Sequence, residues 1–172
     1  GLLDKSIPMY EEALDIFRQL SEKYPLVYQT QIAMTQMNIG VLYMALGNMN
    51  RSIELLEATI ATYQEMAKHK SGVYEPNIAM TLVNLGMAYD AAHRYDEGKE
   101  VLDQATKIYG RLAEKTPAAF NFYYAYSLNT QASNSIFQNR FADAERQARQ
   151  AVDIEASQVI FQTNLAVALL TT

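Results

Sequence analysis

One short sequence pattern occurs twice in this chain, and its two copies lie 46 residues apart. Each copy starts with Ile-Ala-Met-Thr and continues at equal spacing with Asn38, Gly40 and Tyr43, or with Asn84, Gly86 and Tyr89. The same step superimposes Phe17 on Tyr63 and Tyr109, and Tyr28 on Tyr74 and Phe120. A fixed period of this length is typical of units that cannot bury their apolar faces alone and must stack on their neighbours. The sequence therefore predicts a repeat protein.

Apolar residues recur at spacings of three and four along most of the chain, which places them on one face of a helix. The first segment shows this spacing with Met9, Ala13, Ile16, Phe17 and Leu20. Prolines close two helices, and turns are expected at Gly47-Asn48, Ser71-Gly72, His93-Arg94 and Asn139-Arg140. We expect helices at residues 4–23, 28–46, 49–69, 74–92, 95–115, 119–138 and 141–156, and a last one from residue 158.

Pairing these helices divides the chain into repeats. The expected whole repeats are residues 28–73, 74–119 and 120–157, with the second helix of an incomplete repeat at 1–27 and the first helix of another at 158–172. The last step is shorter, because Asn164 matches Thr130 at a distance of 34 residues. Half-repeats expose apolar end faces, since natural arrays protect their ends with polar caps. We therefore expect a piece of a longer array, or an array that another molecule completes.

Residues at fixed places in each copy resemble the tetratricopeptide repeat, which combines a large apolar, a small and an aromatic residue in its first helix with small residues in its second. The corresponding residues are Ile39, Gly40, Tyr43, Gly47, Met49, Ser52 and Thr59; then Leu85, Gly86, Tyr89, Tyr95, Gly98 and Ala105; then Gln131, Ala132, Ser135, Asn139, Phe141, Ala144 and Ala151. Of these, Gln131 and Ser135 depart from the family pattern. The resemblance covers nearly the whole chain. It implies an all-α fold, in which residues 1–172 form one right-handed superhelical solenoid of antiparallel helix pairs, with about eight helices.

The 46-residue step is longer than the roughly 34 residues usual in that family. The extra residues lie around 67–77 and 113–123 and lengthen the second helix and its connector. In this respect the chain is similar to the long repeats of kinesin light chains. Helix-pair repeats without the signature, such as HEAT or Sel1-type repeats, remain alternatives.

Composition restricts the classes of partner. A formal net charge of −5 and a pI near 5.0 argue against nucleic acid, because its binding relies on clustered Lys and Arg. The apolar run 159–170 is too short and too polar to span a bilayer, so we expect no membrane insertion. We expect a cytoplasmic protein, although a chain that begins Gly1-Leu2 without Met leaves open a removed targeting segment.

The resemblance implies that the first helix of each repeat lines a concave groove. The groove residues expected on this basis are Met34, Met37, Asn38, Val41, Met80, Val83, Asn84, Met87, Tyr126, Asn129, Thr130 and Ser133. Asn recurs at one position, in Asn38, Asn84 and Asn164, and a column of amides offers the donors and acceptors that an extended peptide backbone needs. Alternatively, each Asn binds the backbone of its own repeat. The Met residues either adapt to varied apolar side chains or belong to the core.

Two further features bear on the ligand. Some tetratricopeptide domains bind carboxylates at a partner's C-terminus through Lys, Asn and Arg side chains, and the corresponding positions here are Met37, Val41, Asn84, Tyr126 and Thr130. Because Asn84 alone fits, we expect no chaperone-tail binding of that type. An aromatic run consists of Phe120, Phe122, Tyr123, Tyr124 and Tyr126, which cannot all point inward from one helix. Some of these rings either reach the groove or a partner, or pack in the core.

No pattern of catalytic or metal-ligating residues is recognisable. His69 and His93 are the two histidines, and each lies at an expected helix end, where a role at the helix dipole is the usual one. Asp90 and His93 lack a third ligand. We therefore expect a non-catalytic module, with no cofactor and no metal, that binds a peptide or partner helix as part of a larger scaffold or regulatory protein. Alternatives are a structural element that assembles end to end as a homo-oligomer through its terminal helices, and a sensory domain for a small ligand.

Overall fold

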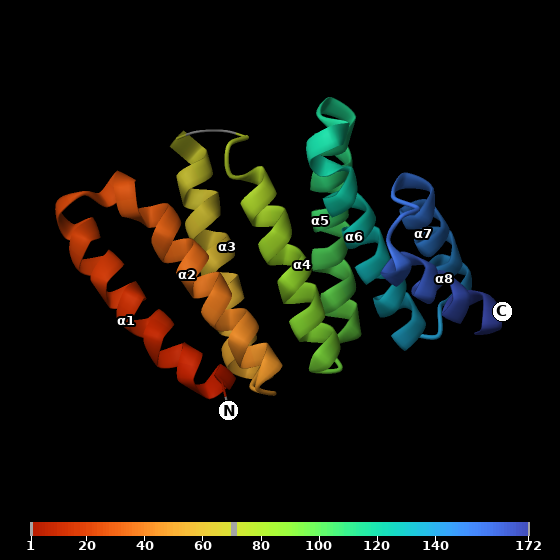
Figure 1. Cartoon of the computed structure of the whole chain (residues 1–172), viewed down its shortest axis with the longest axis horizontal. Helices are drawn as coiled ribbons and strands as arrows, with labels where there is room; N and C mark the ends of the chain where they lie inside the picture. The colour runs from red at the N-terminus through yellow and green to blue at the C-terminus, as the bar shows by residue number, and fades with distance from the viewer. Residues whose placement is uncertain (1, 70–71, 172) are drawn as a thin grey trace. The chain divides into compact units, whose positions relative to one another are not determined.

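The computed structural model describes residues 2–69 and 72–171, and within these ranges the chain forms eight α-helices and no strand. The helices are α1 (Leu2–Lys23), α2 (Pro25–Ala45), α3 (Met49–His69), α4 (Glu75–Ala91), α5 (Tyr95–Lys115), α6 (Pro117–Phe137), α7 (Phe141–Ile154) and α8 (Val159–Thr171). Consecutive helices pack as antiparallel pairs (Figure 1), so the predicted all-α class of helix pairs is confirmed. The expected break at Ser71 lies outside the described residues.

The helices fall into two compact units that divide between Ala92 and His93. In unit 1, α1, α2, α3 and α4 pack in chain order, and α2 also contacts α4. In unit 2, α5, α6, α7 and α8 do the same, and α6 also contacts α8. Every helix of a unit thus packs on its chain neighbours within that unit. The predicted division into repeats of one solenoid stays a prediction.

Backbone turns occur where the sequence predicted them. Gly47 (φ 80°), His93 (φ 60°) and Asn139 (φ 57°) adopt the left-handed conformation that ends a helix and lets the chain reverse. The Asn48 N–H donates to the Tyr43 carbonyl at 2.8 Å, which satisfies an acceptor at the end of α2. The prolines do more than close the preceding helix, because α2 and α6 each have a proline in their first turn.

The small residues of the repeat pattern allow close helix packing in unit 1. A Cβ atom added to Gly40 on α2 would lie 3.1 Å from Cγ of Leu56 on α3. Leu56 has no exposed surface at this α2–α3 contact. Tyr63 of α3 is also fully buried, and its ring stacks on Tyr74 at the start of α4. Rings then close the pairs at their other end: Phe17 stacks on Tyr28, with ring centroids 6.1 Å apart.

Unit 2 repeats this packing with two differences. Tyr109 stacks on Tyr123 with centroids 5.6 Å apart, although the 46-residue step aligns Phe120, one helical turn earlier, with the partner rings of unit 1. Polar residues also replace apolar ones in the core: Gln131 Nε2 donates to Asp103 Oδ1 at 2.6 Å, and Asn134 Nδ2 donates to the Tyr95 carbonyl at 2.9 Å. Of the two departures from the family pattern, Gln131 is thus hydrogen-bonded, and Ser135 Oγ lies 2.9 Å from the side-chain amide of Gln147, so neither is orphaned.

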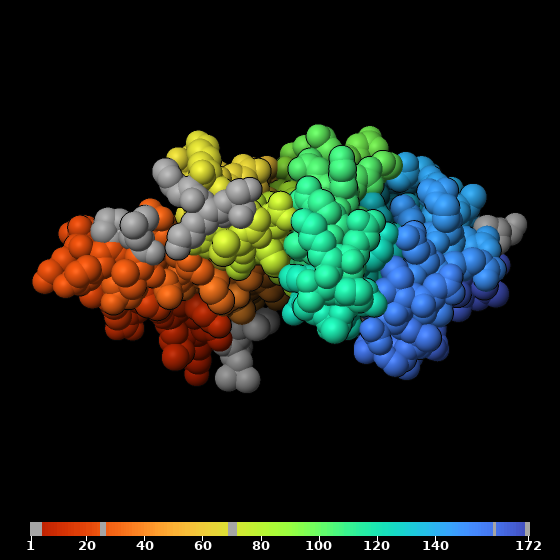
Figure 2. Space-filling model, turned by 90° about the horizontal axis from the view of Figure 1, so that it is seen from above, coloured from red at the N-terminus to blue at the C-terminus, as the bar shows by residue number. Residues whose placement is uncertain are grey.

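The length of α7 accounts for the shorter last repeat step. α5 and α6 each contain 21 residues, whereas α7 contains 14 and ends at Ile154. The carboxyl-terminal end of α5 and the amino-terminal end of α6 therefore extend beyond α7 (Figure 1). This end of α6, in teal, faces the viewer of Figure 2. We call this part of unit 2 the α5–α6 overhang.

Candidate functional site

Most of the expected groove residues of unit 1 are at least partly exposed. On α2, the side chain of Met34 is 46% exposed, and Met37, Asn38 and Val41 are half-buried. On α4, the half-buried residues are Met80, Asn84 and Met87. The two helices touch, with Oγ1 of Thr81 at 3.5 Å from Sδ of Met37. We call the surface formed by these seven predicted residues the α2–α4 face.

The two asparagines of the α2–α4 face have unused amides. Within the described residues, neither the Asn38 nor the Asn84 side chain forms a hydrogen bond, although both are half-buried. An amide that is partly withdrawn from water and has no protein partner retains two donors and an acceptor for a ligand. Asn38 and Asn84 are therefore half-buried amides without a hydrogen bond among the described residues, and the amide column itself stays a prediction.

Three residues that were predicted to line the groove are instead buried, so this part of the prediction is wrong. Val83 is 0% exposed, Asn129 is 4% exposed and Thr130 is 7% exposed. Val83 points into the apolar interior, as a branched aliphatic side chain does when its helix is covered on that face. The Thr130 hydroxyl donates to the Tyr126 carbonyl one turn earlier at 3.0 Å, which uses its donor within α6. None of the three offers a group to a ligand.

In unit 2 the recurring asparagine binds the protein itself. Nδ2 of Asn164 on α8 approaches three acceptors on α6: the Asn129 carbonyl at 3.1 Å, Asn129 Oδ1 at 3.0 Å and Ser133 Oγ at 2.8 Å. This network fastens α8 to α6. Asn164 therefore bonds within the protein, but to the helix of the preceding repeat and not to the backbone of its own repeat, and one of its partners is the predicted groove residue Ser133.

The aromatic run of α6 divides between the core and the surface. The half-buried Tyr126 ring stacks on Phe122 at 6.3 Å, and burial raises the pKa of Tyr126. Phe122 also lies 6.3 Å from the fully buried Phe161 of α8. Phe122 and Tyr123 nevertheless remain 44% and 37% exposed. Their rings are thus packed on one side and open on the other.

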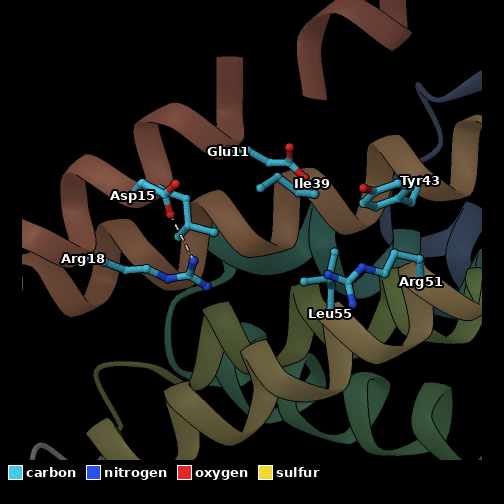
Figure 3. A pocket seen from close by; sticks show the side chains of 8 residues that line it. Glu11, Asp15, Arg18, Ile39, Tyr43, Arg51 and Leu55 are labelled. Atoms are coloured by element: carbon cyan, nitrogen blue, oxygen red, sulfur yellow. Dashed lines mark hydrogen bonds and ion pairs between the residues drawn. The ribbon is translucent and has the colours of Figure 1, made fainter. Parts of the chain in front are cut away.

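Sequence reasoning missed a cavity of about 260 Å³ between α1, α2 and α3 (Figure 3). Arg18 reaches its rim and pairs with Asp15 at 3.2 Å, while Arg51 pairs with Glu54 at 2.7 Å. Each of these two arginines is paired with a carboxylate of its own helix. The arginines therefore add no net positive charge to the cavity. Among the described residues, no group of three or more His, Cys, Asp or Glu side chains could hold a metal ion.

The family model described as tetratricopeptide repeat matches residues 31–111 of the chain. No curated protein matches the sequence significantly. None of the helices described here is long and apolar enough to cross a membrane.

Solved structures share the fold at low sequence identity. BtubC (BKLC) from P. vanneervenii has a TM-score of 0.68 at 16% identity, and the match covers 98% of this chain but 63% of BtubC. A kinesin light chain-like protein of Podospora anserina, with nearly identical TPR-like repeats, has a TM-score of 0.65 at 20% identity, with coverage of 99% and 82%. The second TPR domain of human RPAP3, solved in complex with the HSP70 peptide SGPTIEEVD, has a TM-score of 0.61 at 18% identity, with coverage of 82% and 98%.

Proposed function

We propose that this chain, in which residues 31–111 match the tetratricopeptide repeat family model, is a non-catalytic interaction module that binds a peptide or partner helix on the α2–α4 face. The observation that carries this proposal is the pair of unbonded, half-buried amides of Asn38 and Asn84. A peptide backbone supplies the complementary carbonyls and N–H groups. Protein interaction is also the general role of this family.

The chemistry of the face favours a ligand with apolar side chains. Met34, Met37 and Met80 belong to the same face as the two amides and are at least partly exposed, and flexible thioether side chains adapt to varied apolar partners. The face contains no Lys or Arg to bind the acidic residues of a peptide such as the one bound by the RPAP3 domain. We therefore propose an uncharged or apolar segment as the ligand.

Panning a phage library of random short peptides against the whole chain, followed by fluorescence-polarisation measurement of Kd, tests the proposal. Net hydrogen bonds contribute about 0.5–1.5 kcal/mol each, so Asn38→Ala combined with Asn84→Ala should weaken binding about tenfold. Asn50→Ala is the control, since Asn50 is an exposed amide on α3 of the same unit. Selected peptides that bind the double variant as tightly as the control would overturn the proposal.

A second candidate function is end-to-end self-assembly, which the exposed apolar residues of α1 and α8 favour. Within unit 1, α1 packs on α2, and its other side exposes Met9 (70%) and Ile16 (49%). On α8, Val159 and Leu170 are 73% and 87% exposed. Contiguous exposed apolar side chains are typical of interaction surfaces. A second copy of the chain would cover them if α8 of one copy packed on α1 of the next.

Light scattering over a range of concentrations distinguishes this candidate from a monomeric module. Self-assembly predicts a mass that rises with concentration and is held at the monomer value by Ile16→Glu or Leu170→Glu, because each change puts a charge into the apolar contact. Gln104→Glu adds the same charge at an exposed position of α5 and should leave the association unchanged. A monomer at all concentrations would exclude end-to-end assembly.

A further inference from the structure

The α5–α6 overhang contains a second cavity, of about 390 Å³, where α5 and α6 extend beyond the short α7. Its lining residues are Gly110, Ala113, Glu114, Asn121, Tyr124, Asp153 and Ile154. They come from three helices of unit 2. The cavity is therefore distinct from the α2–α4 face, which belongs to unit 1.

The aromatic wall of this cavity is fixed in place from two sides. A Cβ atom added to Gly110 would lie 3.3 Å from Cε2 of Tyr124, so the ring lies directly on the α5 backbone. From α7, Nε2 of Gln150 donates to the Tyr124 hydroxyl at 2.9 Å. The 46-residue step aligns Gly110 with Gln64 and Arg18, whose long side chains show that glycine is not a requirement of the repeat at this position. Glycine instead leaves room for the ring.

The charge of the cavity is of one sign. Its two charged lining residues are both carboxylates, Glu114 from α5 and Asp153 from α7. Neither carboxylate forms an ion pair or hydrogen bond with another described residue. This differs from the cavity of unit 1, where Arg18 is paired with Asp15. A cationic ligand would complement the unpaired carboxylates of unit 2.

We propose that this cavity binds an arginine side chain of a partner protein. A guanidinium group stacks on an aromatic ring and donates hydrogen bonds to carboxylates in its own plane, which suits the Tyr124 ring flanked by Glu114 and Asp153. The Asn121 side chain lies at the same cavity and adds an amide acceptor. A volume of about 390 Å³ accommodates one such side chain. The site does not depend on the α2–α4 face, so the two proposals stand or fall separately.

The probe for the test is the blocked peptide Gly-Gly-Arg-Gly-Gly, titrated into the isotopically labelled whole chain and followed by NMR. Amide shifts should change around Gly110, Glu114, Asn121 and Asp153. The neutral analogue with citrulline in place of arginine should bind about tenfold more weakly, since two ion pairs and a cation–π contact together correspond to one or two factors of ten.

Variants assign the binding to the two carboxylates. Glu114→Gln combined with Asp153→Asn keeps the shape of both side chains and should weaken the arginine peptide about tenfold. Glu100→Gln removes an exposed carboxylate elsewhere on α5 and should leave the Kd unchanged. Gly110→Gln, which introduces the residue of the preceding repeat, should abolish binding by filling the cavity. The proposal is overturned if the shifts lie elsewhere, if citrulline binds equally well, or if Glu100→Gln weakens binding as much as the double variant.

Discussion

Gly40 lies close against α3, because a Cβ there would lie 3.1 Å and 3.2 Å from two atoms of the Leu56 side chain. Two effects compete when a methyl group is added. Alanine is about 1 kcal/mol better than glycine inside a helix, whereas overpacking a core costs about 1–3 kcal/mol. The fully buried Leu56 decides between them, since it has little room to move.

We predict that Gly40→Ala lowers the free energy of unfolding in the wild-type chain by about 1 kcal/mol. In a Leu56→Ala background, which itself costs about 2–5 kcal/mol, the same change should instead stabilise the chain by up to about 1 kcal/mol. Denaturant unfolding of the four proteins measures both values. If Gly40→Ala changed the free energy of unfolding equally in both backgrounds, contact with Leu56 would not be the reason why glycine is required at position 40.

Buried tyrosines give a prediction in the alkaline range. Burial raises the pKa of Tyr63, which is 0% exposed and has Asn77 as its hydrogen-bond partner. Since the folded-state pKa lies above the unfolded value of about 10, this contribution to stability is complete below pH 10 and is lost as pH rises through the folded-state pKa. The free energy of unfolding should fall by up to about 1.4 kcal/mol per pH unit for this group. Tyr63→Phe should make that fall less steep, and Tyr10→Phe at an exposed position is the control.

The recurring asparagines show how far the candidate site could be predicted from the sequence. Asn38, Asn84 and Asn164 occupy one repeat position, and their recurrence predicted a column of amides. It did not predict that Asn164 is bonded to α6 while the other two are not. The reason lies in the facing helix: Met37 and Val41 stand in α2 where Asn129 and Ser133, the partners of Asn164, stand in α6. Comparing the facing helices of the two units could have revealed this difference before the structure was known.

At the scale of helices, the sequence predicted the helix bounds well, but it did not predict the cavity that unequal helix lengths create. The predicted bounds of 49–69 and 95–115 coincide with α3 and α5, because glycine, asparagine and proline signals mark those ends. The expected helix 141–156 ends at Ile154, within two residues. The cavity of the α5–α6 overhang was not predicted, because it depends on where α7 ends relative to the start of α6 at Pro117.

The attachment of α8 gives a prediction at this scale. Asn164→Ala removes the amide that approaches Asn129 and Ser133, and it should cost about 1–3 kcal/mol because the buried Asn129 and the half-buried Ser133 then lack this donor. Hydrogen exchange of the α8 amides should then become faster. Thr163→Ala is the matched control, since the exposed Thr163 bonds to Val159 within α8. Unchanged exchange in α8 after Asn164→Ala would mean that apolar contacts alone attach this helix.

Across the molecule, helix contacts within each unit join neighbours or next neighbours in the chain. Stability in such an arrangement is a sum of local terms, so damage in one place should stay there. Phe161 has no exposed surface and packs with Ala125, Leu128 and Ala151 of unit 2. Its loss should therefore unfold unit 2 preferentially.

We predict that Phe161→Ala, at a cost of about 3–5 kcal/mol, accelerates hydrogen exchange in α6–α8 and leaves α1–α3 protected. Leu56→Ala should do the reverse, because Leu56 is buried in unit 1. Mass spectrometry of proteolytic peptides resolves the two sets of helices. A uniform rise of exchange over both units, from either change, would show that the chain unfolds as one cooperative body.

The change from the long helices α5 and α6 to the short helix α7 affects where along the repeats an extended ligand can bind. Along an array of equal repeats, a ligand can slide by one repeat and meet nearly the same contacts, so its position is poorly defined. The end of α7 at Ile154 interrupts that equivalence, because the overhang beside it is formed by α5 and α6, which are longer than α7. A partner that contacts the overhang beside the end of α7 would lose that contact if it moved along by one repeat. The unequal repeat therefore marks one position along unit 2 as different from the others.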